Sequence, residues 1–568
     1  MPACRISPAH LLLVACWMVA ISLKDAAAQV SADLALVDGK IWTVNEEQPQ
    51  AEAAAIWQGR ILAVGSTKSI QALIGAETRV IHLNGRRVIP GFHDCHVHLL
   101  AGGLQLRRVD LKDAADEAEF GRRLQDCNRR LPPGRWMLGG NWDHDRTFAG
   151  KLPTAAMLDV YVPDRPCLLS RYDGHMAVAN SKALELAAIT AKTEDPSGGE
   201  IVRDPASKQP TGILRDTAMR LVADLLPPLA DDEIAQAIEA ALELARRLGV
   251  TSIDDMAGEE AEVRRRLLQC YQQMGREGRL TARIHLRWPL EDWAELADLG
   301  VQQGFGGDFV TIGGVKGFID GSLGSSTAKM WQTYQNEPGS TGLFVMPPDR
   351  LGELIRQADA AGLAVAVHAI GDRGNSTLLD LFADVTRTNP PRDRRFRIEH
   401  AQHLTPKDFG RFAEGHVIAS MQPYHAVDDG RWAEGRIGTE RCKSSYAFRS
   451  LLDHGARLAF GSDWPVAPLD PLAGIDAAVN RRTIDGEHPN GWFPEQRITA
   501  AEAIRAYTRD AAYATFCERR SGSIAPGMQA DLAALSRDIL AQEERSHISD
   551  AKVTLTIVAG QIIYEATP

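Results

Sequence analysis

Between residues 90 and 515, short apolar segments alternate with amphipathic helical stretches. This rhythm is typical of parallel βα units, because a parallel strand is reached only through a long crossover connection. Stretches 231–248 and 351–361 are two such crossovers. Eight segments fit buried strands, namely 92–98, 251–256, 283–288, 315–320, 364–369, 396–401, 417–422 and 458–463. They predict an α/β fold built on a closed (β/α)8 TIM barrel, with an open doubly wound sheet as the alternative.

Both ends of the chain carry a different pattern, in which short strand candidates are separated by glycine turns. The N-terminal part, 29–89, has turns at Asp38-Gly39 and Gln58-Gly59, and the C-terminal part, 516–568, has one at Ala559-Gly560. Such turns are typical of β-hairpins. Neither end has enough strands to bury a sheet face alone. We therefore expect the two ends to pair into one small β-sandwich domain beside the barrel of residues 90–515.

The first two barrel strand candidates are separated by more than a hundred residues. Residues 130–215 contain strands and turns of their own, including Pro196-Ser197-Gly198-Gly199. A segment inserted after a barrel strand leaves from the end where barrel enzymes carry their sites. We therefore expect 130–215 to be an insertion that lies over the barrel mouth as a cover or specificity wall.

The composition narrows the class of partner. With 44% hydrophobic and 24% charged residues, the chain is close to an average soluble globular protein, which argues against disorder and against a membrane bundle. A net charge of −11 argues against nucleic acid and anionic membranes as partners. A small-molecule substrate is expected, and a homodimer is compatible with the sequence. The cysteines are too widely spaced for a disulfide framework.

The N-terminus resembles an export signal. Arg5 precedes an apolar stretch from Leu11 to Leu23, and Ala26-Ala27-Ala28 precedes Gln29. A cleaved signal peptide over 1–28 is expected, which predicts a periplasmic or secreted protein without a membrane span. A lipid anchor at Cys16 is the second reading, because Leu13-Val14-Ala15-Cys16 resembles a lipoprotein box.

His96 and His98 form a His-x-His pair at the end of the first strand candidate. Residues i and i+2 of a strand point to the same side, so the two imidazoles face one direction. The carboxyl ends of the strands are where barrel enzymes place their sites. A lone His-x-His pair is weak evidence, because two satisfied strand histidines would give the same pattern.

Three other strand candidates also end in a polar group. His368 ends the fifth, His400 ends the sixth and Asp463 ends the eighth. Histidines buried by chance would not fall repeatedly at that one position. Imidazole and carboxylate are ligands of zinc and related divalent ions. Together the strand tips predict a metal site.

Lys316 lies in an apolar strand candidate, on the same face as Phe318 and Asp320. A buried lysine is costly unless it is used. One reading is a lysine that snorkels to solvent or pairs with Asp320. The other is a neutral amine that takes up CO₂ and becomes a carbamate bridging two metal ions.

In these motifs the chain resembles the amidohydrolase superfamily, in particular its YtcJ-like branch (amidohydrolase family 3), which includes N-substituted formamide deformylases. The resemblance covers nearly the whole mature chain. It rests on segments 88–98, 173–175, 315–324, 368–372, 398–401, 461–465 and 522–532.

The resemblance implies a metal-dependent enzyme that hydrolyses carbon–nitrogen bonds other than peptide bonds, with N-substituted formamides among its candidate substrates. It also implies the ligands. His96, His98 and Asp463 would hold one divalent ion, with zinc expected. His368 and His400 would hold a second ion. If a single ion is present, His400 would lie beside its ligands without binding the ion. Lys316, as a carbamate, would bridge two ions.

The expected reaction uses a metal-activated hydroxide, with Asp463 as general base and then general acid. His400 or His175 would stabilise the oxyanion. Further candidates for substrate contact are Asp143, His175, Asp372 and Trp464, for which local turn bonds or core packing are the alternatives. A metal-dependent esterase or lactonase on the same scaffold, and a non-catalytic exported barrel protein, remain alternative functions.

Overall fold

The computed structural model describes residues 31–171, 176–258 and 260–566. The predicted signal peptide, Cys16 and the candidate His175 lie outside these ranges. None of the helices in these ranges has the length and apolar character that a membrane crossing requires.

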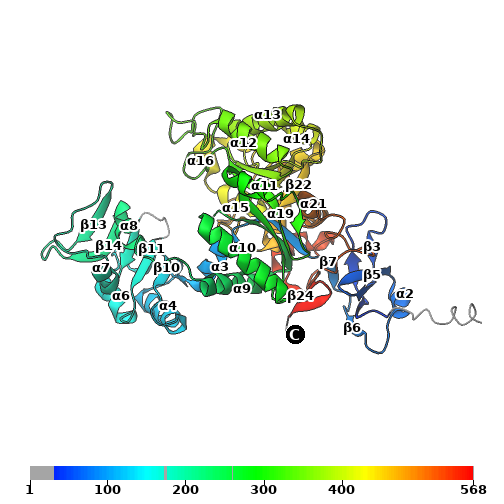
Figure 1. The fold of residues 1–568 in the computed structure, drawn as a ribbon, viewed down its shortest axis with the longest axis horizontal. Coiled ribbons are helices and arrows are strands. Elements are labelled where there is room, and N and C mark those ends of the chain that lie inside the picture. Colours follow the sequence, from blue (N-terminus) through cyan, green and yellow to red (C-terminus); the bar gives the residue numbers. More distant parts are fainter. Residues whose placement is uncertain (1–30, 172–175, 259, 567–568) are drawn as a thin grey trace, which may run out of the picture.

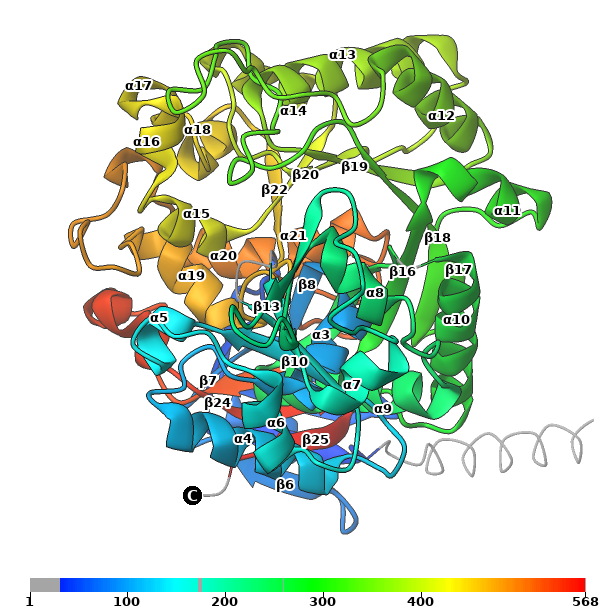
Figure 2. The same cartoon turned by 90° about the vertical axis from the view of Figure 1, so that its left-hand side faces the viewer.

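The central element is a nearly closed barrel of eight parallel strands (Figures 1 and 2), which confirms the predicted barrel. Neighbouring strands follow one another in chain order, unlike the reversed order of a doubly wound sheet. The strands are β8 (Phe92–Val97), β15 (Val250–Met256), β16 (Arg283–Pro289), β18 (Val310–Phe318), β19 (Ala364–Ala369), β20 (Arg397–His400), β21 (Ile418–Met421) and β22 (Arg457–Phe460). A two-residue strand, β17 (Phe305–Gly306), pairs with β18 outside this path.

The seam between the first and last strands is closed at their carboxyl ends. The Asp463 N–H donates to the His96 carbonyl at 2.7 Å, and the His98 N–H donates to the Trp464 carbonyl at 2.9 Å. These two hydrogen bonds hold Asp463 beside the His-x-His pair. The backbone that closes the barrel therefore also assembles its polar end.

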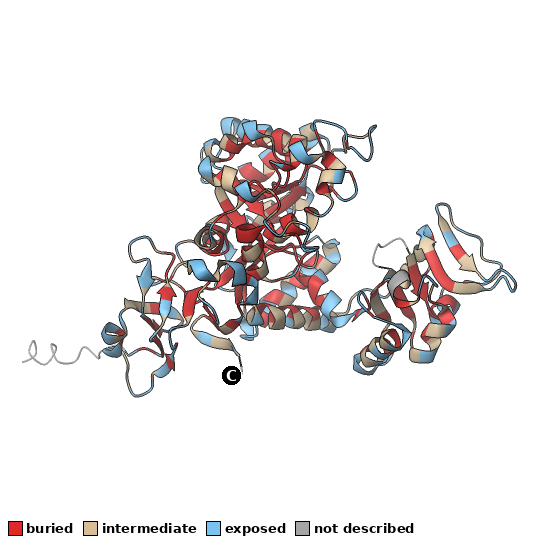
Figure 3. Cartoon of the chain, turned by 180° about the vertical axis from the view of Figure 1, so that it is seen from behind, coloured by how far each residue is buried: buried red, intermediate tan, exposed pale blue. Residues whose placement is uncertain are grey.

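Barrel strands are buried on both sides, as parallel sheets require (Figure 3). The crossover helices turn one apolar face inward. In α9 (Asp231–Arg247), buried Ile234, Ile238, Ala241 and Ala245 recur at helical spacing. The other long outer helices are α3 (Leu99–Arg107), α10 (Ala261–Arg276), α12 (Pro348–Ala360) and α13 (Asp372–Thr388).

Two further sheets lie beside the barrel (Figure 1), the first built from N-terminal strands alone and the second from strands of both chain ends. The first has the order β5-β4-β1-β6 and the second β25-β24-β23-β7-β2-β3. Leu36 and Ile56 of the first share one buried apolar cluster with Val88, Leu532 and Ile557 of the second. The strands are β1 (Leu34–Val37), β2 (Lys40–Trp42), β3 (Gln50–Ala51), β4 (Ala53–Trp57), β5 (Arg60–Gly65), β6 (Arg79–His82), β7 (Arg87–Pro90), β23 (Leu532–Leu535), β24 (Val553–Val558) and β25 (Gln561–Glu565).

The insertion contains a six-stranded sheet of its own, in the order β13-β14-β12-β11-β10-β9. Its strands are β9 (Val109–Asp110), β10 (Met137–Trp142), β11 (Cys167–Arg171), β12 (Met176–Ala179), β13 (Gly199–Arg203) and β14 (Pro210–Asp216). The sheet thus begins well before residue 130. It is covered by α4 (Glu117–Arg130), α6 (Ala155–Tyr161) and α7 (Ser181–Leu186).

The insertion projects outward from the barrel, with α3 and α9 at its base (Figure 1). Arg135 of the insertion pairs with Asp232 and Glu233 in the first turn of α9, at 3.1 and 2.9 Å. A cavity of about 80 Å³ lies at this junction, lined by residues of the insertion, α3 and α9. Viewed along the direction of projection, the insertion stands in front of the barrel (Figure 2). That it covers the mouth stays a prediction.

Candidate metal centre

His96, His98 and Asp463 form a compact donor group at the carboxyl ends of β8 and β22. The Nε2 atoms of His96 and His98 lie 3.5 and 3.4 Å from Asp463 Oδ1. Ligand atoms about 2.0–2.2 Å from a tetrahedral zinc lie roughly 3.3–3.6 Å from one another. The observed separations match those of ligands that share one divalent ion. The donor set therefore fits a metal ion.

Hydrogen bonds at the far ring nitrogens orient these imidazoles. His96 Nδ1 lies 2.7 Å from the Glu399 carboxylate, and His98 Nδ1 lies 3.1 Å from the Met256 carbonyl. Both partners accept, so each Nδ1 carries the proton and each Nε2 presents its lone pair to the donor group. Metal-binding histidines are typically held in this way.

A chain of buried charges inside the barrel supports Glu399. Arg397 binds Glu399 at 2.8 Å and also pairs with Asp254, to which Arg287 donates at 2.9 Å. Burial opposes ionisation of Glu399, but Arg397 and the hydrogen bond from His96 hold the pKa of this carboxyl well below its ordinary value. Glu399 is therefore an anion that fixes the His96 ring.

His93 belongs to the barrel interior and not to the donor group. Its ring stacks on that of His285 with centroids 5.0 Å apart. Burial lowers the pKa of His93 well below its ordinary value, so the ring is neutral. Neither ring nitrogen of His93 has a hydrogen-bond partner within the described residues.

Two residues of the centre hold unusual backbone conformations. Asp463 has a φ of 61° and His400 a φ of 73°, both in the left-handed region that non-glycine residues rarely adopt. Such strain persists where the surrounding structure imposes it, commonly at functional sites.

Asp463 is an anion: burial opposes its charge, but His96 and His98 hold the pKa of this carboxyl well below its ordinary value.

Lys316 is buried in β18, with its Nζ 4.4 Å from the centroid of the Phe318 ring. Burial lowers the pKa of Lys316 to about 8, against the opposing charges of Glu399 and Asp463. Asp320 instead accepts backbone N–H groups, at 3.0 Å from Ile370 and 2.8 Å from both Lys329 and Gly371. The structure thus gives Asp320 an anchoring role in the loop after β18.

His368 is the penultimate residue of β19, with its ring centroid 4.6 Å from that of His400. Its Nε2 lies 3.1 Å from the Gly321 carbonyl. Burial, followed by the charge of Lys316, lowers the pKa of His368 to about 3, so this imidazole is neutral. Two compact His/Asp groups occur at the strand tips within the described residues, and His368 belongs to neither.

The candidates for substrate contact lie in different settings. Asp372 begins α13 and accepts the Trp331 N–H at 2.8 Å, which ties down the loop after β18. Trp464 is buried against α3. Asp143 is half-buried and follows β10 of the insertion. The structure thus assigns structural contacts to Asp372 and Trp464.

Gly102 in α3 makes room for Trp464. A Cβ at this position would lie 2.2 Å from the Trp464 ring. Gly102→Ala should therefore lower the stability by about 1–3 kcal/mol through overpacking, although alanine favours a helix. Because Trp464 follows Asp463, metal affinity should fall as well. Thermal unfolding and metal titration measure the two effects.

Gly275→Ala in α10 is the matched control, because a Cβ there would meet Leu280 at an ordinary 3.6 Å. It should be neutral or stabilising by up to about 1 kcal/mol. Equal effects of the two substitutions would contradict the packing argument.

Sequence reasoning missed four residues of the centre. Glu399 and Arg397 lie within β20, and Gln422 and His425 follow β21. Gln422 Oε1 lies 2.7 Å from His400 Nδ1. The signal for His425 was the run Gln422-Pro423-Tyr424-His425 directly after a strand, the same placement that identified the other tips.

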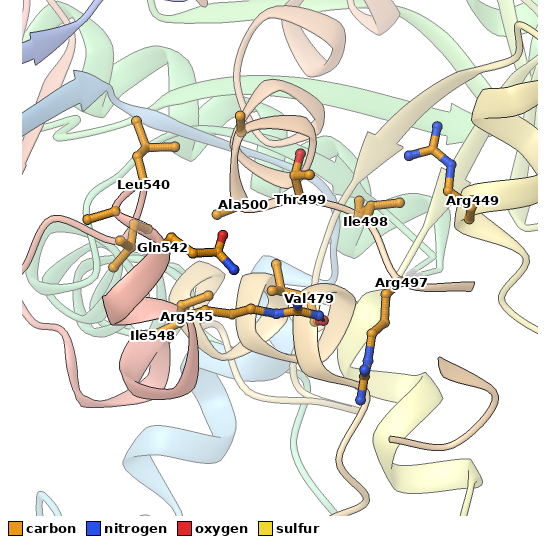
Figure 4. Close-up of a pocket in the computed structure, with 13 residues that line it drawn as sticks. Arg449, Val479, Arg497, Ile498, Thr499, Ala500, Leu540, Gln542, Arg545 and Ile548 are labelled. Atoms are coloured by element: carbon orange, nitrogen blue, oxygen red, sulfur yellow. The ribbon is translucent and has the colours of Figure 1, made fainter. Parts of the chain in front are cut away.

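A separate cavity of about 390 Å³ lies among α19 (Pro471–Asn480), α20 (Ala500–Ala506) and the 3-10 segment η5 (Gln542–Asp550) (Figure 4). Val479 and Ile548 supply apolar walls, and Arg497 and Arg545 supply cations. The candidate metal ligands do not line it.

A parallel barrel with buried histidine and aspartate donors at its strand tips defines the class of metal-dependent barrel enzymes. The comparison with protein families agrees. Residues 79–564 match the amidohydrolase family, and the chain belongs to that family. It is therefore a hydrolase by family.

Relatives span nearly the whole chain. Protein LONG AFTER FAR-RED 3 of Arabidopsis thaliana is 41% identical, covering 94% of this chain and 92% of the relative. Putative amidohydrolase YtcJ of Bacillus subtilis is 33% identical, covering 93% and 98%. The N-substituted formamide deformylase of Arthrobacter pascens is 27% identical, covering 94% and 99%. These matches confirm the predicted family resemblance.

Among solved structures, an uncharacterized metal-dependent hydrolase from Pyrococcus furiosus is 32% identical, with a TM-score of 0.73. The match covers 89% of this chain and all 100% of that chain. Most of this chain therefore shares its fold with a metal-dependent hydrolase.

Proposed function

We propose that this protein is a zinc-dependent amidohydrolase that cleaves carbon–nitrogen bonds other than peptide bonds, with N-substituted formamides as a candidate substrate class. The observation that carries the proposal is the compact group of His96, His98 and Asp463, whose separations of 3.4–3.5 Å match ligands of one ion. The formamide deformylase among the relatives supports the substrate class. We read the two terminal sheets as a β-sandwich that supports the barrel.

A divalent ion bound by this group supplies Lewis acidity and makes water a nucleophile near neutral pH. The proton transfers of the reaction are carried out by a residue of the chain. Asp463, held as an anion at the barrel seam, accepts the proton of the attacking water. It then returns that proton to the leaving nitrogen, because an amide anion is too basic to depart unaided.

His98 is the more open of the two histidines, with 31% of its side chain exposed against 1% for His96. Substrate therefore reaches the centre from the His98 side, while Glu399 keeps His96 fixed below. Neutral His368 lies beside His400 and donates its Nε2–H to the Gly321 carbonyl, which fixes the ring at the wall of the centre. The exposed Phe318 ring, 5.3 Å from His368, offers an apolar contact for the substituent.

The test combines metal analysis with a panel of N-formyl amines, N-acyl amines and carboxylic esters. We expect bound zinc in purified protein, turnover of at least one amide, loss of turnover on chelation and recovery when zinc is restored. Heat-treated protein with added zinc controls for hydrolysis by free metal. Protein without metal and without turnover would refute the proposal, and turnover confined to esters would refute its carbon–nitrogen specificity.

A further inference from the structure

Asp463 belongs to two compact donor groups at the strand tips. The first is His96, His98 and Asp463, and the second is His400, His425 and Asp463. Within each group the ligand atoms lie within 4.8 Å of one another. The second group unites the ends of β20, β21 and β22, which are neighbours in the barrel.

His425 lies in α15 (Pro423–Asp429), directly after β21. Its Nε2 is buried and has no hydrogen-bond partner within the described residues. An unsatisfied buried polar atom costs about 1–3 kcal/mol. The His425 ring stacks on that of His400, with centroids 6.4 Å apart and planes 14° apart. His425 thus belongs to the second donor group and keeps a buried ring nitrogen without a partner among the described residues.

His400 also keeps a ring nitrogen that can bind a cation. Its Nδ1 donates to Gln422 Oε1 at 2.7 Å, so its Nε2 presents a lone pair. Its left-handed backbone conformation holds the side chain at the strand tip. His368, in contrast, uses its Nε2 on the Gly321 carbonyl. His368 also lies outside both compact donor groups, whereas His425 shares one with His400, so His425 is the better placed companion of His400.

We propose that His400, His425 and Asp463 form a second cation site, in which Asp463 is shared with the first site and His425 is a ligand. This differs from the ligand set that the family resemblance implies, where His368 joins His400 and a Lys316 carbamate makes the bridge. Imidazole-rich sites favour zinc, cobalt and nickel over magnesium and calcium. The inference rests on the proposed function for the presence of metal in the first site.

The test is the number of ions bound. Metal-free protein, prepared with a chelator and checked for its fold by circular dichroism, is loaded with Co²⁺, desalted and analysed by mass spectrometry. We expect two Co²⁺ per chain for the wild type and one for His425→Gln. Electron paramagnetic resonance should show spin coupling between the two ions of the wild type and none in the variant.

Three variants sharpen the result. His454→Gln, at the exposed histidine directly after α18 (Phe448–Asp453), is the matched control and should bind two ions. Lys316→Met should also bind two, because Asp463 and not a carbamate makes the bridge. His425→Asn is the second variant at this position. If His425→Gln does not fold, a folded His425→Asn should bind one ion.

The outcomes separate the two proposals. Wild-type protein that binds no Co²⁺ would refute the proposed function. One ion in the wild type, two ions in a folded His425 variant, or one ion in Lys316→Met would overturn the second site while leaving the hydrolase proposal intact.

Discussion

Replacing Asp463 with asparagine should lower kcat at least about a thousandfold, even at saturating zinc. General acid–base catalysis alone contributes about 10²–10⁴-fold. Asparagine keeps an oxygen near His96 and His98 but cannot take up the proton of the attacking water. It also removes the negative charge that both donor groups share, so metal affinity should fall as well.

The measurement is the steady-state rate on the best amide of the panel, with zinc content determined in the same samples. Asp298→Asn, at the end of α11 (Trp293–Asp298), is an exposed control that should retain the wild-type rate. If Asp463→Asn carries the wild-type complement of zinc and keeps more than about a tenth of the rate, Asp463 is not the group that transfers the proton.

Replacing Glu399 with glutamine should weaken both the fold and the metal site. Glu399 is fully buried between His96 and Arg397, at 2.7 and 2.8 Å. Removing one partner of a buried ion pair costs about 3–5 kcal/mol. Loss of a carboxylate behind a metal-binding histidine typically lowers metal affinity about 10–100-fold. Urea unfolding of metal-free protein and competition with a chelator measure the two losses.

The stability loss should depend on pH. The folded-state pKa of Glu399 lies below its unfolded value of about 4.3, so its contribution is fully present above that pH and is lost as the pH falls. The difference between wild type and Glu399→Gln should therefore be constant near neutrality and shrink in acid. Glu414→Gln, an exposed control, should show no such difference. A gap that widens in acid would contradict the assigned charge of Glu399.

The barrel strands could be predicted because buried parallel strands are continuous apolar runs bounded by turns. The candidate 364–369 coincides with β19, and 92–98 with β8 apart from its last residue. The ring of His96, His98, His368, His400 and Asp463 followed from one rule, that barrel strands present their last side chains at one end.

The support beneath the ligands could not be predicted in this way. Barrel interiors are usually filled by branched apolar residues. Here Asp254, Arg287, Arg397 and Glu399 fill the interior as paired charges. Each is a local exception to the apolar pattern, and only the three-dimensional structure shows that they compensate one another. His425 escaped notice because it lies in a short helix, outside the strand pattern.

The bounds of the insertion were also beyond the sequence pattern. Its first strand, β9, has two residues, which is too short to leave a periodic signal. Its place beside β10 is set by hydrogen bonds between distant parts of the chain.

The seam between β8 and β22 ties metal loading to the completion of the protein. Its hydrogen bonds join residues 96 and 463, which are far apart in the chain, and ordering such a long loop is entropically costly and slow. A nascent or half-folded chain therefore holds the His-x-His pair without its aspartate. The three ligands come together only when the barrel closes. We therefore expect metal binding, and with it hydrolysis, to follow folding of the whole barrel and not to begin during synthesis.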